Sequence, residues 1–291
     1  MSVEVQRFDD AQTFLDEAGP YLAEREAEHN LIFGIASTIV VDPDRYATRA
    51  TPYLAVVRRE DEVVAAAVWT PPYKAELSLI DDHDAIMALV ADLARVPVTL
   101  PGVTAPPAVA RRFVDAWSAR HSVSARLSMV ERIYRVERVV APSDVDGSMR
   151  MATSGDRSLL IDWMRAFMAE VHDDHDDGAT TALVDSALQT GSRVFYLWEV
   201  DGRPVSTAGV SGPTPNGIRL GPVFTPPEDR GHGYASAVTA GASQVQLDAG
   251  KRFVFLFTDT ANPTSNKIYQ AIGYEPVTDV DQWTFEPGGA S

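Results

Sequence analysis

The 291-residue chain is 45% hydrophobic and 23% charged, which argues against a disordered protein and, at this length, favours two globular domains. Its formal charge of −16 argues against a general nucleic-acid partner, because phosphate backbones need a clustered basic surface. No apolar run approaches the ~20 residues that span a bilayer. Met1–Glu4 also lacks the features of a secretory signal, so we expect a cytoplasmic protein without membrane contact. The absence of cysteine excludes disulfides, thiolate metal ligands and group transfer through a cysteine nucleophile.

The first half of the chain, up to about residue 141, combines short strands with helices. A hairpin is expected where two apolar runs, 53–57 and 63–69, flank the turn residues Arg59-Glu60-Asp61. The other elements expected in this half are a strand at 3–8, helical stretches through 39, helices near 82–94 and 108–121, and a closing strand near 127–136. The turn-rich segment from Ala141 to Ser148 has few large apolar groups, so it is predicted to link this half to the next.

The second half repeats a similar order of elements. Its first helix is predicted where large apolar residues recur at spacings of three and four and form one stripe. An Asp201-Gly202 turn between two apolar runs predicts a hairpin. The expected elements are a strand at 149–151, helices at 156–171 and 179–190, hairpin strands at 194–198 and 204–210, a strand ending at 221–225, a helix at 233–249, a strand at 253–257, a helix at 263–272 and an extended segment at 274–285. The sequence therefore predicts a duplicated fold with domains at 1–141 and 148–291.

The stretch from Val223 to Ser236 is a strand end, a loop with two glycines and a helix start. Such a helix start exposes backbone N–H groups and a partial positive charge, which together accept a phosphate without a cationic cluster. The glycines let the backbone approach the anion, and Arg230 is placed to close on a phosphate oxygen. The dinucleotide fingerprint fails because Ser236 stands where its third glycine belongs, and the P-loop fails for want of Gly-Lys-Ser/Thr. The alternative is a tight strand-to-helix connection with glycines for packing.

Two motifs carry a resemblance to a known family. Arg230-Gly231-His232-Gly233-Tyr234-Ala235 resembles the Arg/Gln-x-x-Gly-x-Gly/Ala loop of the GNAT superfamily of N-acetyltransferases. The segment from Asn262 to Tyr274 resembles the second motif of that family, with an Asn, a small residue three later, a Tyr seven later, and then Gly plus an aromatic residue. The resemblance by motifs covers 148–288. The first half resembles the family only in the order of its helices and strands. It implies an α/β (α+β) fold of two tandem GNAT-like acyl-CoA N-acyltransferase domains, each with a mixed, mostly antiparallel central sheet flanked by helices.

The resemblance also implies acetyl-CoA as co-substrate, with no metal. Tyr269 then corresponds to the general acid of the family, which protonates the thiolate leaving group. The alternative for Tyr269 is a core tyrosine with a satisfied hydroxyl. The implied cofactor-binding residues are Val223, Phe224 and Thr225 for the pantetheine arm, Arg230, Gly231, His232, Gly233, Tyr234, Ala235 and Ser236 for the pyrophosphate, and Asn262, Ser265 and Asn266 for the far wall.

The catalytic base and the acceptor stay open. Glu170, Glu199 and Asp259 are the candidate bases, although Glu199 also suits a hairpin-end charge and Asp259 a turn or cap. The missing cysteine favours direct transfer to a primary amine of a small molecule or peptide. The segment 170–177 contains five carboxylates and two histidines, but it has neither zinc spacing nor the order of an EF-hand. The interpretations that remain are an electrostatic funnel for a cationic acceptor and a solvated helix end.

The first half departs from the family pattern because it has no such loop. Asp81, Asp82 and Asp84 would repel a pyrophosphate from the start of its helix. We therefore expect that this half does not bind CoA, and that it packs on the other half, shapes the acceptor pocket or forms a homodimer contact. The predicted function is an acetyl-CoA-dependent N-acetyltransferase. The alternatives are a CoA or acyl-CoA sensor without turnover and a structural module that binds a partner.

Overall fold

The computed structural model describes residues 3–46, 50–171 and 177–286, and its chain forms two compact units. Unit 1 comprises 1–133 together with 257–262 and 276–291, and unit 2 comprises 134–256 and 263–275. The last strand of the chain therefore belongs to the unit that is built mainly from the first half. The sequence predicted two domains that follow one another along the chain, 1–141 and 148–291, and these limits stay a prediction.

Unit 1 has a mixed sheet in the order β1-β2-β3-β4-β5-β12-β6. Neighbours from β1 to β4 are antiparallel, β4 and β5 are parallel, and β12 is antiparallel to β5. Its elements are β1 (Val3–Phe8), α1 (Ala11–Ala23), α2 (Asn30–Val41), β2 (Tyr53–Arg59), β3 (Glu62–Trp69), β4 (Ala75–Leu77), α3 (His83–Leu93), β5 (Gly102–Ala105), α4 (Pro107–His121), β6 (Ser124–Val136, up to Ile133) and β12 (Glu275–Glu286, from Pro276).

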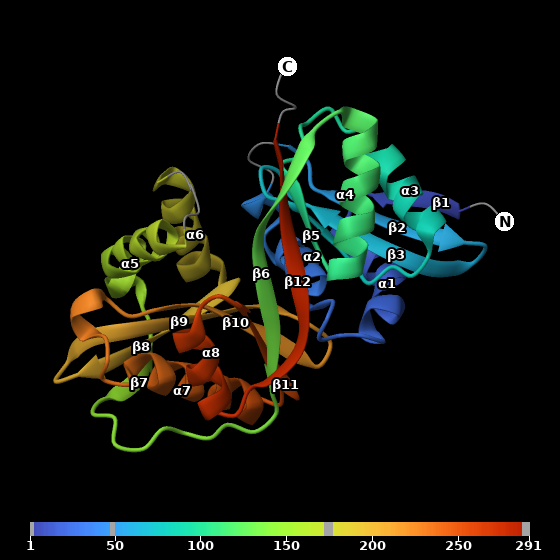
Figure 1. The fold of residues 1–291 in the computed structure, drawn as a ribbon. Helices are drawn as coiled ribbons and strands as arrows, with labels where there is room; N and C mark the ends of the chain where they lie inside the picture. Colours follow the sequence, from blue (N-terminus) through green and yellow to red (C-terminus); the bar gives the residue numbers. More distant parts are fainter. Residues whose placement is uncertain (1–2, 47–49, 172–176, 287–291) are drawn as a thin grey trace. The chain divides into compact units, whose positions relative to one another are not determined.

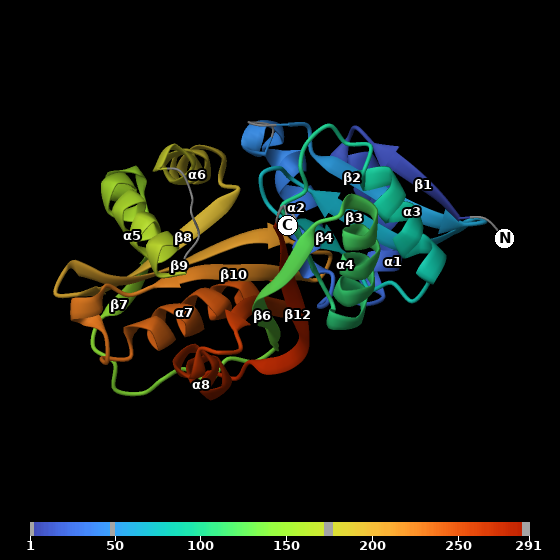
Figure 2. The same cartoon turned by 45° about the horizontal axis from the view of Figure 1, so that its top comes forward.

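The core of unit 1 lies on both faces of this sheet. Successive residues of a strand point to opposite faces, so Leu54 and Val56 pack against α1 and α2. Ala55 and Val57 pack against α3 and α4 on the other face. The views in Figures 1 and 2 show the two helix pairs on opposite sides of the strands. Such near-continuous apolar strands are typical of a sheet covered on both faces.

Unit 2 has the same layered plan, with strand order β11-β10-β9-β8-β7. Phe195 and Leu197 pack against α5 and α6, whereas Tyr196 packs with residues of α7 and α8 on the other face. Its elements are β7 (Ser148–Met151), α5 (Arg157–Glu170), α6 (Asp177–Thr190), β8 (Arg193–Val200), β9 (Arg203–Pro213), β10 (Gly217–Phe224), α7 (Tyr234–Asp248), β11 (Phe253–Asp259, up to Leu256) and α8 (Pro263–Ala271).

Two strands of unit 2 separate along their length. β10 and β11 are parallel and pair at Gly217 with Phe253, Ile218 with Val254 and Arg219 with Phe255. No later β10–β11 pair is found in the described strands. On its other side β10 stays antiparallel to β9, with an irregularity between Leu220 and Val223. The predicted fold class is confirmed. The opening lies beside the end of β10, where Val223, Phe224 and Thr225 are predicted to bind a cofactor.

The short strands β4 and β5 of unit 1 were not predicted. β4 has three residues and β5 has four, which is too short to show alternation. Elsewhere the expected helices and strands are present with ends shifted by a few residues. No described helix is long and apolar enough to cross a membrane.

Candidate active site

The opened end of β10 carries the residues predicted to hold a pantetheine arm. Val223 and Phe224 pair with Ala208 and Thr207 of β9. Beyond Arg219, within the strands that the structure describes, β10 has no ladder partner on its β11 side. Thr225 follows at once, with its Oγ1 2.8 Å from Ser206 Oγ. This edge of β10 is therefore open to an extended ligand that hydrogen-bonds along a strand.

The start of helix α7 presents a row of backbone donors. The amide of Ala237 donates to the Gly233 carbonyl at 3.0 Å, which is the first bond of the helix. Among the described residues, the six preceding amides, from Gly231 to Ser236, donate to no group. Gly231 and Gly233 have φ of +85° and +81°, which only glycine adopts without strain. The arrangement fits an anion at a helix N-terminus.

The loop before α7 is anchored by an ion pair between a buried carboxylate and an exposed arginine. Asp229 is 6% exposed and accepts two hydrogen bonds from the Arg203 guanidinium, at 2.7 and 2.8 Å. Arg203 holds the pKa of Asp229 below its usual range. A methyl group added at Gly233 would meet Val145, so this glycine is needed for space as well as for its backbone conformation. The donors of the loop are therefore held in place by the fold.

Arg230 lies beside these donors but is engaged by a carboxylate. Its Nε donates to the Thr225 carbonyl at 3.0 Å, and its Nη2 pairs with Glu170 at the end of α5. Both side chains are about half exposed. The contact gives Glu170, one of the three candidate bases, a role as the counter-ion of Arg230.

Tyr269 has a hydroxyl without a partner. The Tyr269 ring packs against Tyr274 and Tyr134, with centroid distances of 6.0 and 6.4 Å. Its hydroxyl makes no hydrogen bond to any residue that the structure describes. Burial raises the pKa of Tyr269 to about 12, so the O–H stays protonated at neutral pH. The alternative of a core tyrosine with a satisfied hydroxyl has no support in these contacts.

Asn266 is positioned by a residue from far away in the chain. Its Oδ1 accepts a hydrogen bond of 2.9 Å from the Tyr134 hydroxyl, which in turn accepts one of 3.0 Å from Gln270. Tyr134 is fully buried at the end of β6. It was not predicted as a site residue, and no local signal distinguishes it from an ordinary strand tyrosine. Ser265 lies in the same helix, α8, whereas Asn262 belongs to unit 1.

The other two candidate bases also have structural partners. Glu199 accepts a 2.8 Å hydrogen bond from Arg150 Nε, and Arg150 also binds Asp156 with two bonds of 2.8 Å. Asp259 Oδ1 accepts from the Ala261 amide at 2.8 Å, as a residue in a turn does. The choice among Glu170, Glu199 and Asp259 stays open.

The acidic segment 170–177 is described only in part. Residues 172–176 lie outside the described residues, so the alternatives weighed for this segment, a metal site and an electrostatic funnel, lie outside them too. In the parts of the chain that are described, no group of three or more His, Asp or Glu side chains is arranged to hold a metal ion.

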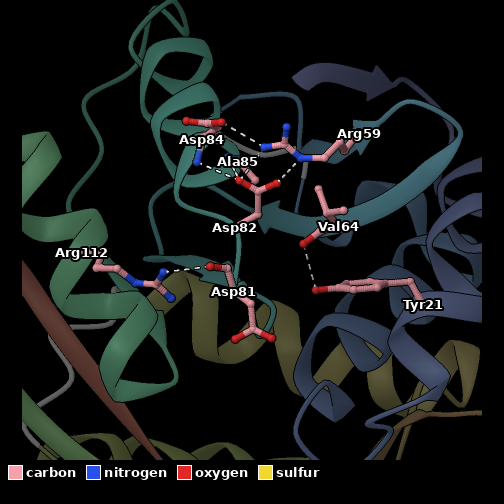
Figure 3. Close-up of polar contacts among 8 residues, drawn as sticks. All are labelled: Tyr21, Arg59, Val64, Asp81, Asp82, Asp84, Ala85 and Arg112. Atoms are coloured by element: carbon pink, nitrogen blue, oxygen red, sulfur yellow. Dashed lines mark hydrogen bonds and ion pairs between the residues drawn. The ribbon is translucent and has the colours of Figure 1, made fainter. Parts of the chain in front are cut away.

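The corresponding helix of unit 1 begins differently (Figure 3). Its N-cap Asp82 accepts hydrogen bonds from the Asp84 and Ala85 amides, at 2.9 and 3.3 Å. Arg59 donates two hydrogen bonds to the same carboxylate, at 2.7 and 2.9 Å, and one of 3.0 Å to Asp84. Arg59 holds the pKa of Asp82 below its usual range. The chain's own carboxylate thus occupies the place where a bound phosphate would meet this helix.

Comparison with known proteins agrees with this geometry. Residues 158–274 match the sequence model of the acetyltransferase (GNAT) family. A solved Drosophila protein superimposes with a TM-score of 0.70 at 11% identity, covering 98% of this chain and 99% of its own. A GNAT-family acetyltransferase from Colwellia psychrerythraea gives 0.58 at 10% identity, with 97% and 100% covered. A tandem GNAT protein from the clavulanic acid biosynthesis pathway gives 0.58 at 14%, with both chains fully covered. No curated protein matches the chain by sequence.

Proposed function

Because residues 158–274 form a domain of the GNAT acetyltransferase family within a tandem GNAT fold, we propose that this protein is an acetyl-CoA-dependent N-acetyltransferase. The observation that carries the proposal is the start of α7, where the amides of Gly231 to Ser236 are exposed next to the opened edge of β10. An acyl-CoA ligand has a pyrophosphate, which the α7 amides could bind. It also has an amide-containing arm, which could pair with the open edge of β10. The donor set therefore fits both parts of one ligand.

The residues of unit 2 divide the binding between them. The α7 amides and the helix dipole would hold the pyrophosphate, and Arg230 would exchange its Glu170 partner for a phosphate oxygen. The backbone of Val223 to Thr225 would pair with the pantetheine arm. Acetyl-CoA supplies the thioester that is cleaved, and the protein supplies orientation and a hydrogen-bond donor at the sulfur.

Direct transfer is favoured, since the chain has no cysteine to carry an acyl group. The acceptor nitrogen attacks the thioester carbon, a C–N bond forms, and the electron pair of the broken C–S bond goes to sulfur. The Tyr269 O–H donates a hydrogen bond to that sulfur as charge develops. With a pKa of about 12, Tyr269 is a weaker acid than a thiol near 8.5, so it keeps its proton and stabilises the departing thiolate through the hydrogen bond. The amine proton leaves to a carboxylate or to water.

A second candidate function is a CoA-binding sensor without turnover. One observation favours it: in unit 1 the Asp82 side chain caps the start of α3. A tandem protein that has lost one ligand site can also have lost chemistry at the other.

One experiment separates the candidates. The full chain is mixed with acetyl-CoA and a panel of primary amines, thiol release is recorded, and acetyl-CoA binding is measured separately by calorimetry. The proposal expects saturable binding and thiol release that depends on the amine. Binding without thiol release on any amine supports the sensor, and absence of binding overturns both functions and leaves the structural module.

A further inference from the structure

Helix α8, which carries Tyr269, is short and shallow. It has nine residues, all of them within the described part of the chain, and none is fully buried. A helix of this length is marginal without tertiary contacts, so its placement depends on what holds it to the rest of unit 2. Placement matters at a catalytic group, because a displacement of ~1 Å can slow a reaction by ~100-fold.

The C-terminal end of α8 is fixed by main-chain hydrogen bonds. The Tyr274 amide donates to the Tyr269 carbonyl at 2.9 Å. The Val140 amide, from the segment after β6, donates to the Ile272 carbonyl at 3.0 Å. These bonds determine where the helix ends, whereas the direction of the Tyr269 side chain also depends on the contacts that hold the inner face of the helix.

Tyr134 of β6 holds that inner face. Its O–H donates to Asn266 Oδ1 at 2.9 Å, and the same oxygen accepts a hydrogen bond of 3.0 Å from Gln270 Nε2. Residues four positions apart lie one above the other on a helix face, so one hydroxyl group spans a full turn of α8. Because Tyr134 is fully buried in a packed core, its own position is well defined.

The turn held by Tyr134 contains Tyr269. Tyr269 follows Asn266 by three residues, so the two lie on neighbouring parts of one helix face. The Tyr134 and Tyr269 rings are also in contact, with centroids 6.4 Å apart and planes tilted by 54°. The Tyr269 hydroxyl itself bonds to no residue that the structure describes. Its position therefore depends on the ring contacts and on the turn of helix that Tyr134 holds.

We propose that Tyr134 is a positioning residue for acetyl transfer, which holds the Tyr269 hydroxyl at the departing sulfur by fixing α8 through Asn266 and Gln270. This inference rests on the proposed function and adds a residue to it. Tyr134 acts through Tyr269 and takes no part in the chemistry itself.

Tyr134→Phe is the first test, because it keeps the ring and removes both hydrogen bonds. In the full chain, kcat for thiol release should fall about tenfold, while KM for acetyl-CoA stays within about threefold of wild type. Tyr196→Phe is the matched control. Tyr196 is also a buried strand tyrosine, and its hydroxyl accepts a 3.1 Å hydrogen bond from Gln246 of α7. Both variants should lose a similar Tm, but Tyr196→Phe should keep the wild-type kcat.

A double-mutant cycle separates positioning from general support of the fold. Added to Tyr269→Phe, the change Tyr134→Phe should lower kcat no further, because no hydroxyl remains to be misplaced. The Tm losses of the two changes should still combine. A kcat loss in the double variant equal to the product of the two single losses would overturn the proposal.

Gln270→Met provides a variant that should fold normally, since Gln270 is exposed and methionine has a similar length. It removes one of the two hydrogen bonds and should lower kcat about threefold without changing KM for acetyl-CoA. It should add nothing to Tyr134→Phe. A wild-type kcat in both single variants would overturn the positioning role and leave the acetyltransferase intact.

A spectroscopic measurement does not depend on turnover. The nine tyrosines of the full chain are replaced by 3-fluorotyrosine, and the ¹⁹F resonance of Tyr269 is identified by its loss in Tyr269→Phe. Tyr134→Phe and Gln270→Met should shift this resonance in the CoA-loaded protein, whereas Tyr196→Phe should not. Absence of thiol release by wild type with every amine would overturn the proposed function. An unshifted Tyr269 resonance would overturn the positioning role, whether or not the protein turns over.

Discussion

The helix starts of α7 and α3 show how one fold can offer an anion site in one unit and close it in the other. In unit 2, Gly231 and Gly233 take a left-handed backbone conformation, and the amides at the start of α7 have no acceptor among the residues that the structure describes. In unit 1, Asp82 accepts from two α3 amides and is itself held by Arg59. The first amides of α3 are satisfied by a carboxylate of the chain itself, whereas those of α7 are placed where an anion can be bound.

Helices α4 and α8, which follow the next strands β5 and β11, also differ between the units. When Pro106 is matched with Pro263, Arg112 of α4 falls at the place of Tyr269 in α8. Arg112 donates to the carbonyl of Asp81 (Figure 3). It also donates to the carbonyl of Ile80, so it reinforces the closed start just before the α3 cap. Unit 1 thus uses Asp82 and Arg112 to stabilise its own structure. The matching positions in unit 2 are the start of α7 and Tyr269.

The largest expected effect is on Tyr269. Tyr269→Phe should lower kcat about 100-fold, because the hydrogen-bond donor at the sulfur is lost, and leave the Kd for acetyl-CoA nearly unchanged. Thiol-release kinetics and calorimetry measure the two quantities. Tyr274→Phe is the control, since the Tyr274 hydroxyl is satisfied by Ser243 at 2.8 Å, and it should reduce stability but not kcat. An unchanged kcat in Tyr269→Phe would remove the assigned role.

A glycine variant tests whether the open α7 start is the ligand site. Gly231→Val should raise the Kd for acetyl-CoA about tenfold or more, because a β-branched residue strains the left-handed backbone that presents the amides. Gly250→Val, at the other end of α7, is the matched control for Gly231→Val. Gly250 also has a positive φ, +92°, and open space around it. Both variants should lose similar Tm. If both or neither changed the Kd, the α7 start would not be the binding site.

The closed start of unit 1 should matter for stability alone. Asp82→Asn should destabilise the protein by about 1 kcal/mol or less, since asparagine still caps α3 but loses the charge that pairs with Arg59. The pKa of Asp82 is lower in the folded protein than in the unfolded chain, so its contribution is present above the unfolded pKa and is lost as the pH falls through the folded value. Denaturation at pH 7 and in acid should show wild type and variant converging at low pH.

Calorimetry on the same pair of proteins checks the comparison itself. Wild type and Asp82→Asn should each bind one acetyl-CoA per chain. Two equivalents bound by wild type would show that Asp82 does not close unit 1.

The smallest effect is expected at Glu170. Its pair with Arg230 is half exposed, and such pairs contribute about 0–1 kcal/mol. Glu170→Gln should tighten acetyl-CoA binding by about threefold or less by releasing Arg230 for a phosphate. The value of kcat and its pH profile should stay as in wild type. A large loss of kcat would instead identify Glu170 as the base.

Much of the fold was predictable because its signals are local. The apolar stripe predicted over 156–171 is helix α5, and the Asp201-Gly202 turn joins β8 to β9. The loop from Arg230 to Ala235 was found by its glycines, and the acids at 81–84 already suggested that unit 1 differs there. Each of these features depends on residues a few positions apart.

The remaining features depend on strand register and on packing between distant segments. No local pattern indicates that the Tyr134 hydroxyl holds Asn266, that Glu170 meets Arg230, or that residues 276–286 complete unit 1. The Tyr134 hydroxyl reaches α8 only because the Tyr134 side chain points to the face of the sheet that α7 and α8 cover, since a register shift by one residue would turn it to the other face. The sequence by itself determined turns, caps and helix faces, because their energies are set within a few residues. Tertiary structure decided which side chains share a site, because that depends on pairing across the whole sheet.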